Sequence, residues 1–536
     1  MKIFWMKSLV NGFKFIWIKL CNNFGGGSLT VVLDGESLTI EDLVKIARDN
    51  ERIEVSPEAW ERIKNCRKVV EKLIEKREKL YGITTGIGEL SEVFLTPDQV
   101  KDFQKYLIYS HAAGWGEPVA IDDARAAIVT RINTHAKGYS GLRPIVVETL
   151  VNMINKGVTP VMCQKGSVGA SGDLSPMGQM ALVPMGEGEA FYQGKRMSGE
   201  EAMARAGIKT IKYEARDGLA TINGSNVICG MGALQLYDAE RWIKISEIAA
   251  AMSLDALKAN MKAYDERIHK ARGYPGAIIS AENIRRIAEG SEILAEKDKR
   301  VQDAYSLRST PQVVGAARDT LKFARKMFEI EMNSGADNPL FFEDDGGICL
   351  TGANFQGTPL AFALEFLGIG TTTVCVISER RLNRLTNVNL SRGLPPFLTK
   401  GAGMFSGMML AQYTAASLVC ENRVLSTPAA TGSIPTAADQ EDFVSMGMTT
   451  AIKTKQILKN ANAVLGIELM AAAQAFEFRK PLKPGRGCQT AYELIRKHIE
   501  PLEEDRPLYD DITKMADLVK DGKILEVVEK EIGKLK

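Results

Sequence analysis

Residues 166–179 read GSVGASGDLSPMGQ, and the tripeptide Ala170-Ser171-Gly172 lies at the centre of this run. Gly172 has no Cβ atom, so its amide nitrogen can approach the carbonyl carbon of Ala170 in a tight turn. Ring closure at this point, with loss of water from the backbone and from the Ser171 hydroxyl, would leave an imidazolone with an exocyclic methylene group. The run therefore predicts an electrophile that the chain makes from itself. By its residues alone it also fits an ordinary glycine-rich turn that leads into a helix.

The chain around this run is predicted to be mainly α-helical. Apolar residues recur at helical spacing in long stretches rich in Ala, Leu, Met and Glu, which are good helix formers. Strand patterns are few and short, and no long internal repeat is present. We therefore expect a bundle of long helices with a smaller, mixed N-terminal domain. The long stretches are residues 235–265, 310–332, 360–380, 404–425 and 450–475.

The composition is that of an ordinary soluble protein, with 45% hydrophobic and 25% charged residues in a chain of 536. The net charge of +2 lacks the basic excess of a nucleic-acid binder, so we expect no nucleic-acid partner. The eight cysteines contain no C-x-x-C pair and the four histidines no H-x-x-x-H pattern. These absences predict no metal site and a reduced, cytoplasmic location.

Residues 1–28 are expected to form a poorly ordered extension. Residues 1–20 carry four lysines, no acidic residue and many large apolar side chains. A signal peptide or a basic amphipathic surface helix would be the alternatives. The lysines interrupt the apolar stretch before it reaches the ~18 residues of a membrane span. We therefore expect no membrane contact from this segment.

The residues on both sides of the tripeptide, 166–169 and 173–176, resemble the signature of the aromatic amino-acid ammonia-lyase and aminomutase family. Members of that family convert Ala-Ser-Gly into 4-methylideneimidazole-5-one (MIO). The resemblance implies that residues 170–172 form this cofactor autocatalytically. It extends from about Leu29 to the C-terminus in six separated motifs.

The same resemblance implies a domain organisation. An N-terminal domain, residues 29–225, would carry the electrophile, and residues 226–480 would form a central bundle of long helices. The chain becomes charged after about residue 480, which predicts a C-terminal helical tail over residues 481–536. The family forms homotetramers whose sites are assembled from several subunits, so we expect a homotetramer that binds a small amino-acid substrate.

Residues 81–89 read YGITTGIGE and resemble the mobile loop whose tyrosine removes the β-proton of the substrate in this family. The glycines give a closing loop the backbone freedom that it needs. Without the family, three glycines could cradle a phosphate, but no Gly-Lys-Ser/Thr follows. A tyrosine with its ordinary pKa near 10 is a poor base at neutral pH. We therefore expect positive charge or helix N-termini near Tyr81, where they would favour the phenolate.

A third motif, residues 301–308, reads VQDAYSLR. Gln302, Tyr305 and Arg308 are three residues apart, so a helix or turn could direct all three at one ligand. Arg308 suits a bidentate grip on the substrate carboxylate. An exposed polar turn would be the default interpretation without the other motifs. The resemblance places these three side chains in the site, with Tyr305 among the catalytic residues.

Three further residues match single positions of the family pattern. Asn223, in the sequence INGS, matches the amide that binds the substrate carboxylate. Phe355, in GANFQG, matches the aromatic residue near the electrophile, and Glu441 matches the active-site acid.

Two positions bear on the substrate. His111, in the sequence SHAAG, resembles the residue that faces the substrate imidazole in histidine lyases. Glu89 follows Tyr81 by eight residues, and bacterial tyrosine 2,3-aminomutases pair a glutamate there with the same histidine. Glu89 and His111 together could bind a phenolic hydroxyl, and a site built for a hydroxyl rejects analogues without it. Phe443 also departs from the histidine-lyase pattern. The alternative for Glu89 is a solvent-exposed acid at a helix start.

The sequence thus favours a carbon–nitrogen lyase, or 2,3-aminomutase, that acts on L-tyrosine. It would give 4-coumarate, with or without return of the amine to the β-carbon as β-tyrosine. Histidine ammonia-lyase, which forms urocanate, is the alternative. A further alternative is a catalytically inactive family member with a structural role.

Overall fold

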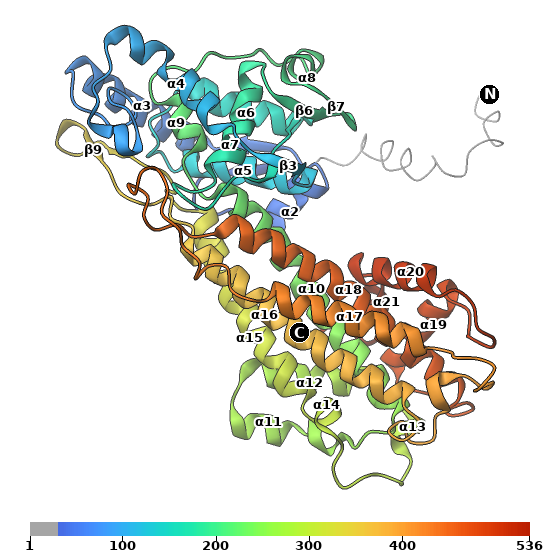
Figure 1. Ribbon diagram of the computed structural model, residues 1–536. Coiled ribbons are helices and arrows are strands. Elements are labelled where there is room, and N and C mark those ends of the chain that lie inside the picture. Colours follow the sequence, from blue (N-terminus) through green and yellow to red (C-terminus); the bar gives the residue numbers. More distant parts are fainter. Residues whose placement is uncertain (1–29) are drawn as a thin grey trace, which may run out of the picture.

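The computed structural model describes residues 30–536, so the expected extension over residues 1–28 lies outside the described residues. The protein is mainly helical, and this confirms the predicted fold class. In Figure 1 a lobe of short helices and small sheets forms the N-terminal part. Long helices extend from this lobe as an elongated body.

The N-terminal lobe is built from short helices with clear start signals. Thr39 accepts the N–H of Asp42 and caps the first of them, as a Thr before two acids suggests. Pro57 occupies the first turn of the next helix behind the cap Ser56. The helices are α2 (Ile40–Arg48), α3 (Pro57–Glu75), α4 (Pro97–His111), α5 (Ile121–Ala136), α6 (Pro144–Lys156), α7 (Leu174–Leu182), α8 (Gly199–Arg205) and α9 (Asp217–Ile222).

The sheets of this lobe are small. Strand β1 (Val31–Leu33) pairs in parallel with β2 (Ile53–Val55), and β3 (Trp115–Pro118) pairs antiparallel with β5 (Cys163–Lys165). The three-stranded sheet has the order β4-β6-β7. Its strands are β4 (Thr159–Pro160), β6 (Glu189–Tyr192) and β7 (Lys195–Ser198). Farther along the chain, β8 (Leu340–Phe342) and β9 (Ile348–Leu350) form an antiparallel pair.

Five long helices form the body. They are α10 (Asn226–Ala256), α15 (Thr310–Met332), α16 (Thr358–Thr386), α17 (Met409–Leu425) and α18 (Gly447–Glu477). Alanines let these helices approach closely, and Ala249, Ala250 and Ala251 of α10 are fully buried. One ion pair, between Arg381 and Glu468, is also fully buried. Serine hydroxyls donate to Glu468 as well, so the buried charge is satisfied.

Shorter helices complete the body. On one side lie α11 (Glu266–Arg272), α12 (Pro275–Ile287), α13 (Glu292–Ala295) and α14 (Tyr305–Arg308). The C-terminal helices α19 (Arg486–His498), α20 (Tyr509–Lys520) and α21 (Lys523–Ile532) pack on the body (Figure 1). One hydrophobic core runs from Leu33 to Leu535 through both parts. The domain bounds at residues 225 and 480 therefore stay predictions.

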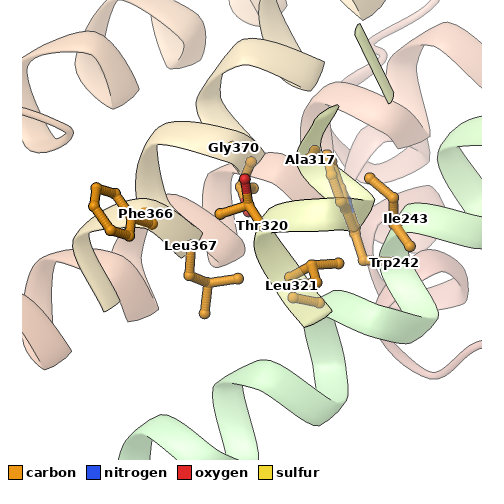
Figure 2. A pocket seen from close by; sticks show the side chains of 10 residues that line it. Trp242, Ile243, Ala317, Thr320, Leu321, Phe366, Leu367 and Gly370 are labelled. Carbon is orange, nitrogen blue, oxygen red and sulfur yellow. The ribbon is translucent and has the colours of Figure 1, made fainter. Parts of the chain in front are cut away.

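Within residues 30–536, α16 is the one helix that is long and apolar enough to cross a membrane. Of its most apolar stretch, 67% is buried inside the protein, and core helices of soluble proteins meet the same criteria. A pocket between α10, α15 and α16 is lined by Trp242, Leu321, Phe366 and other uncharged side chains (Figure 2). This pocket holds no ionisable group and belongs to the helix packing rather than to a reaction site.

Candidate active site

The tripeptide Ala170-Ser171-Gly172 forms a tight turn between β5 and α7. Gly169 and Gly172 pair across this turn as an antiparallel bridge. Ser171 has φ of +51°, in the left-handed region that residues with side chains seldom adopt. The chain therefore holds the backbone around Ser171 in the compact form that ring closure needs.

Close contact with a second backbone segment explains the glycine at position 172. A Cβ atom at Gly172 would lie 2.2 Å from the carbonyl carbon of Gly224. The two glycines form a parallel bridge, and the Asp173 N–H donates to the Gly224 carbonyl at 2.8 Å. Any larger residue at position 172 would clash with the backbone of Gly224 and displace the loop from it.

The loop lies where long helices begin. The buried carboxylate of Asp173, next to α7, accepts the N–H of Ile228 in the first turn of α10 at 2.9 Å. Burial raises the pKa of Asp173 to about 6. The N–H of Met446, the residue before α18, donates to the carbonyl of Val168 at 2.8 Å. Helix N-termini carry partial positive charge, and the N–H groups at the start of α10 offset part of the cost of burying the Asp173 carboxylate.

The N-terminal end of α16 lies beside the start of α10, next to the same loop. The Ser225 hydroxyl, just before α10, donates to the Phe355 carbonyl at 2.6 Å, and α16 begins three residues after Phe355. Phe355 is half-buried. Asn223 is 2% exposed, and its buried Oδ1 atom has no hydrogen-bond partner within residues 30–536. A buried polar atom of this kind suits a ligand.

Glu441 reaches the loop from far along the chain. It lies in the long segment between α17 and α18, where its main chain pairs with Thr436. The Ser171 hydroxyl donates to Oε1 of Glu441 at 2.8 Å. A loop of this length without regular structure is uncommon and is often functional. The structure thus brings together two predicted residues that are 270 positions apart.

Tyr81 lies near this carboxylate, with its hydroxyl accepting the N–H of Gly88 at 3.0 Å. Burial raises the pKa of Tyr81, and the charge of Glu441 adds to the shift; the hydrogen bond from Gly88 and the charge of Arg216 oppose it. The expected positive charge is present as Arg216, but burial outweighs it, so the single chain does not favour the phenolate. Its strongest charged neighbour is an acid rather than a base.

His111 ends α4. Its Nδ1 atom lies 2.7 Å from the Leu107 carbonyl and 3.0 Å from the Ser110 hydroxyl. A carbonyl can only accept, so we assign the proton to Nδ1 and the free lone pair to Nε2. Burial lowers the pKa of His111, against the Leu107 carbonyl and the charge of Glu441, so the ring is neutral at pH 7.

Gln302, Tyr305 and Arg308 do not join this cluster. Gln302 is exposed, Tyr305 is 72% exposed, and the Arg308 guanidinium lies 4.8 Å from the centre of the Tyr305 ring. Arg384, in the last turn of α16, donates to the Ser306 hydroxyl of α14 at 3.2 Å. Helix α16 has 29 residues and so separates its two ends by about 43 Å. Figure 1 shows α14 at the end of the body remote from the lobe.

Glu89 also stays apart. It is exposed in the short 3-10 helix Gly88–Glu92, and within residues 30–536 its carboxylate makes no hydrogen bond or ion pair. Phe443 is 59% exposed. The structure therefore agrees with the simple alternative for Glu89, a solvent-exposed acid at a helix start.

Two polar residues beside the tripeptide were not predicted. Ser167 and Asp173 lie within the quoted run, and Asp173 is fully buried. A carboxylate among small and apolar residues at the start of a helix is a signal that the sequence offered. A buried carboxylate needs a hydrogen-bond donor. For Asp173 the donor is the N–H of Ile228 at the N-terminus of α10.

Sequence and fold match proteins of one family. The family model described as Aromatic amino acid lyase matches residues 38–497. Histidine ammonia-lyase of Caldanaerobacter subterraneus subsp. tengcongensis is 49% identical over 502 residues, or 94% of this chain and 98% of that protein. The crystal structure of tyrosine aminomutase from Streptomyces globisporus has a TM-score of 0.90 at 36% identity and covers 94% of this chain and 99% of its own. Histidine ammonia-lyase from Trypanosoma cruzi has a TM-score of 0.87 at 35% identity, with 94% and 95% covered.

The prediction of tyrosine as the substrate is wrong. Relatives that are 43–49% identical over nearly the whole chain are histidine ammonia-lyases, which supports the alternative interpretation. The tyrosine prediction rested on Glu89, whose carboxylate is exposed and makes no hydrogen bond or ion pair with a described residue, His111 included.

The predicted family is confirmed by a match over most of the chain and by relatives that cover nearly all of it. The loop at Ser171 lies between β5 and α7, meets the N-terminal ends of α10 and α18, and contacts the carboxylate of Glu441. This chain belongs to the aromatic amino acid lyase family and is a carbon–nitrogen lyase.

Proposed function

We propose that this protein is a histidine ammonia-lyase, which eliminates ammonia from L-histidine to give urocanate. The observation that carries the proposal is the hydrogen bond between Ser171 and Glu441, near a neutral His111. The free Nε2 lone pair of His111 can accept the imidazole N–H of the substrate. The names of the relatives support the same substrate.

We further propose that residues 170–172 close into MIO. The bridge between Gly169 and Gly172, the positive φ of Ser171 and the close approach at Gly224 fit such a ring. Once formed, this group supplies the electrophile that makes the substrate amine a better leaving group.

The other side chains have positioning and proton-transfer roles in this proposal. Tyr81 takes the β-proton, and it must lose its own proton first. Asn223 binds the substrate carboxylate through its amide group, and Arg308 grips the same carboxylate with two hydrogen bonds. Gln302, Tyr305 and Phe355 complete the site as the family pattern implies. A cation beside Tyr81 would offset the pKa increase that burial and Glu441 cause.

The active protein is proposed to be a homotetramer in which a second chain supplies Tyr305 and Arg308. The separation of about 40 Å along α16 excludes their reaching Ser171 within one chain. Apolar side chains remain exposed on α16 and α17, as expected for surfaces that associate. They include Phe362, Phe366, Ile369, Leu410, Tyr413 and Val424.

The test is incubation of the pure protein with L-histidine, L-tyrosine and L-phenylalanine, with chromatography of arylacrylates and β-amino acids. We expect urocanate from histidine and little turnover of the other two. Ser171→Ala is the matched control, because it removes the methylene carbon of MIO and should abolish all turnover. An inactive protein without imidazolone absorbance would contradict the proposal, and so would 4-coumarate as the main product.

A further inference from the structure

The Ser167 hydroxyl lies inside the turn that ring closure would use. Its oxygen accepts the N–H of Gly169 at 3.2 Å. The same oxygen lies 3.4 Å from the Gly172 carbonyl and 3.2 Å from Oδ1 of Asp173. Ser167 therefore contacts the residue before the tripeptide and the residues at its end, while it has no part in the reaction proposed above.

The hydroxyl has one proton, so it donates to the Gly172 carbonyl or to Asp173 at any moment. The ionised carboxylate is the stronger acceptor. Asp173 is itself fixed by the N–H of Ile228 at the start of α10. Ser167 thus links the two ends of the tripeptide to a rigid helix.

Ring closure needs this kind of restraint. The amide nitrogen of Gly172 must attack the carbonyl carbon of Ala170. That oxygen leaves as water with the amide hydrogens of Gly172 and Ser171, and a C=N bond to the Ser171 nitrogen replaces the C=O bond. The Ser171 hydroxyl and the Ser171 α-proton leave as a second water, which creates the methylene group. In a free chain the two reacting atoms would rarely meet, and holding them close removes that entropic cost.

We propose that Ser167 is a positioning residue for the self-cyclisation of residues 170–172. None of its hydrogen bonds reaches a ring atom, and it acts by holding Gly169 and Asp173 so that the nitrogen of Gly172 faces the carbonyl carbon of Ala170. This inference rests on the proposed MIO cofactor.

The experiment follows ring closure directly and does not depend on turnover. The full chain is made by cell-free synthesis, translation is stopped, and samples are digested with trypsin over time. The peptide 166–195, bounded by Lys165 and Lys195, contains the tripeptide. Loss of two waters from this peptide, measured by mass spectrometry, gives the rate of ring closure.

Four variants separate positioning from folding. Ser167→Ala removes both hydrogen bonds and should slow ring closure roughly five- to thirty-fold. Ser167→Thr and Ser167→Val have the same shape and differ in the hydroxyl, so only the threonine chain should close at nearly the wild-type rate. Ser175→Ala is the matched control, because the buried Ser175 hydroxyl has no hydrogen-bond partner within residues 30–536.

The thermal midpoint of each variant is measured alongside, and turnover per closed ring should equal that of the wild type. Equal closure rates in the threonine and valine chains would overturn the inference, even if the alanine chain does not fold. Slowing of Ser175→Ala to the same degree would also overturn it, since packing would then explain the effect. If the wild-type peptide never loses water, the MIO proposal itself fails, which is a separate result.

Discussion

Two variant chains, one inactive and one strongly impaired, should restore activity to one another when they assemble together. The first carries Ser171→Ala and cannot form the electrophile, and the second carries Arg308→Ala and cannot grip the carboxylate. Helix α16 separates the two positions by about 40 Å in one chain, and no side chain spans that distance. Each site must then combine the Ser171 loop of one chain with Arg308 of another.

The activity expected of the mixed assemblies follows from the two positions lying in different chains of one site. Loss of the charged hydrogen bonds of Arg308 should lower kcat/KM roughly ten- to a hundred-fold in the pure variant. In random assemblies of the two variants, about a quarter of the sites receive an intact loop and an intact arginine from different chains. Activity should therefore rise to about a quarter of the wild-type value, well above either variant alone.

The assay uses two differently tagged chains that are expressed together. Mixed assemblies are isolated on both tags, and formation of urocanate is followed by its absorbance. The control mixes wild-type chains with chains that carry both substitutions. Shared sites predict about a quarter of full activity in this control too, whereas sites within one chain predict about a half.

The same two measurements can refute the inference that Ser171 and Arg308 of one site come from different chains. No recovered activity in the mixed variants, together with a half in the control, would mean that Ser171 and Arg308 of one chain act in the same site. The separation along α16 would then not describe the active protein.

Three further outcomes are expected. Tyr81→Phe should still form the cofactor, while turnover of histidine falls at least about 10²-fold; wild-type turnover would place the base elsewhere. Glu89→Leu should change histidine turnover by no more than about twofold, because Glu89 was assigned to a phenolic hydroxyl that histidine lacks and it bonds to no described side chain; a tenfold loss would place Glu89 in the histidine site. Burial, followed by the charge of Asp173, raises the pKa of Glu331 from 4.5 to about 7. The folded protein therefore binds this proton more tightly than the unfolded chain, and the resulting stability is complete below about 4.5 and lost as the pH rises through about 7. Glu331→Gln should then match the thermal midpoint of the wild type at pH 5 and exceed it at pH 9; an equal difference at both pH values would refute this.

The sequence alone determined those features that depend on local chemistry. Helical periodicity predicted the long helices, because apolar spacing along a helix reports which face is buried. The tripeptide at residues 170–172 could be recognised because ring closure joins neighbouring residues, and the structure shows the tight turn there. The family followed from these motifs, and the match over residues 38–497 confirms it.

Only the tertiary structure decided what lies beside the loop. Glu441 meets Ser171 because the packing of α10, α16 and α18 brings their N-terminal ends together, which no local pattern encodes. The same packing puts Tyr305 and Arg308 at the opposite end of α16 and leaves Glu89 in solvent. Spacing along a chain fixes which residues share one helix face, whereas distances between helices are set by how their buried faces fit together. For that reason the reacting loop could be predicted from the sequence, and the pKa direction of Tyr81 and the exposure of Glu89 could not.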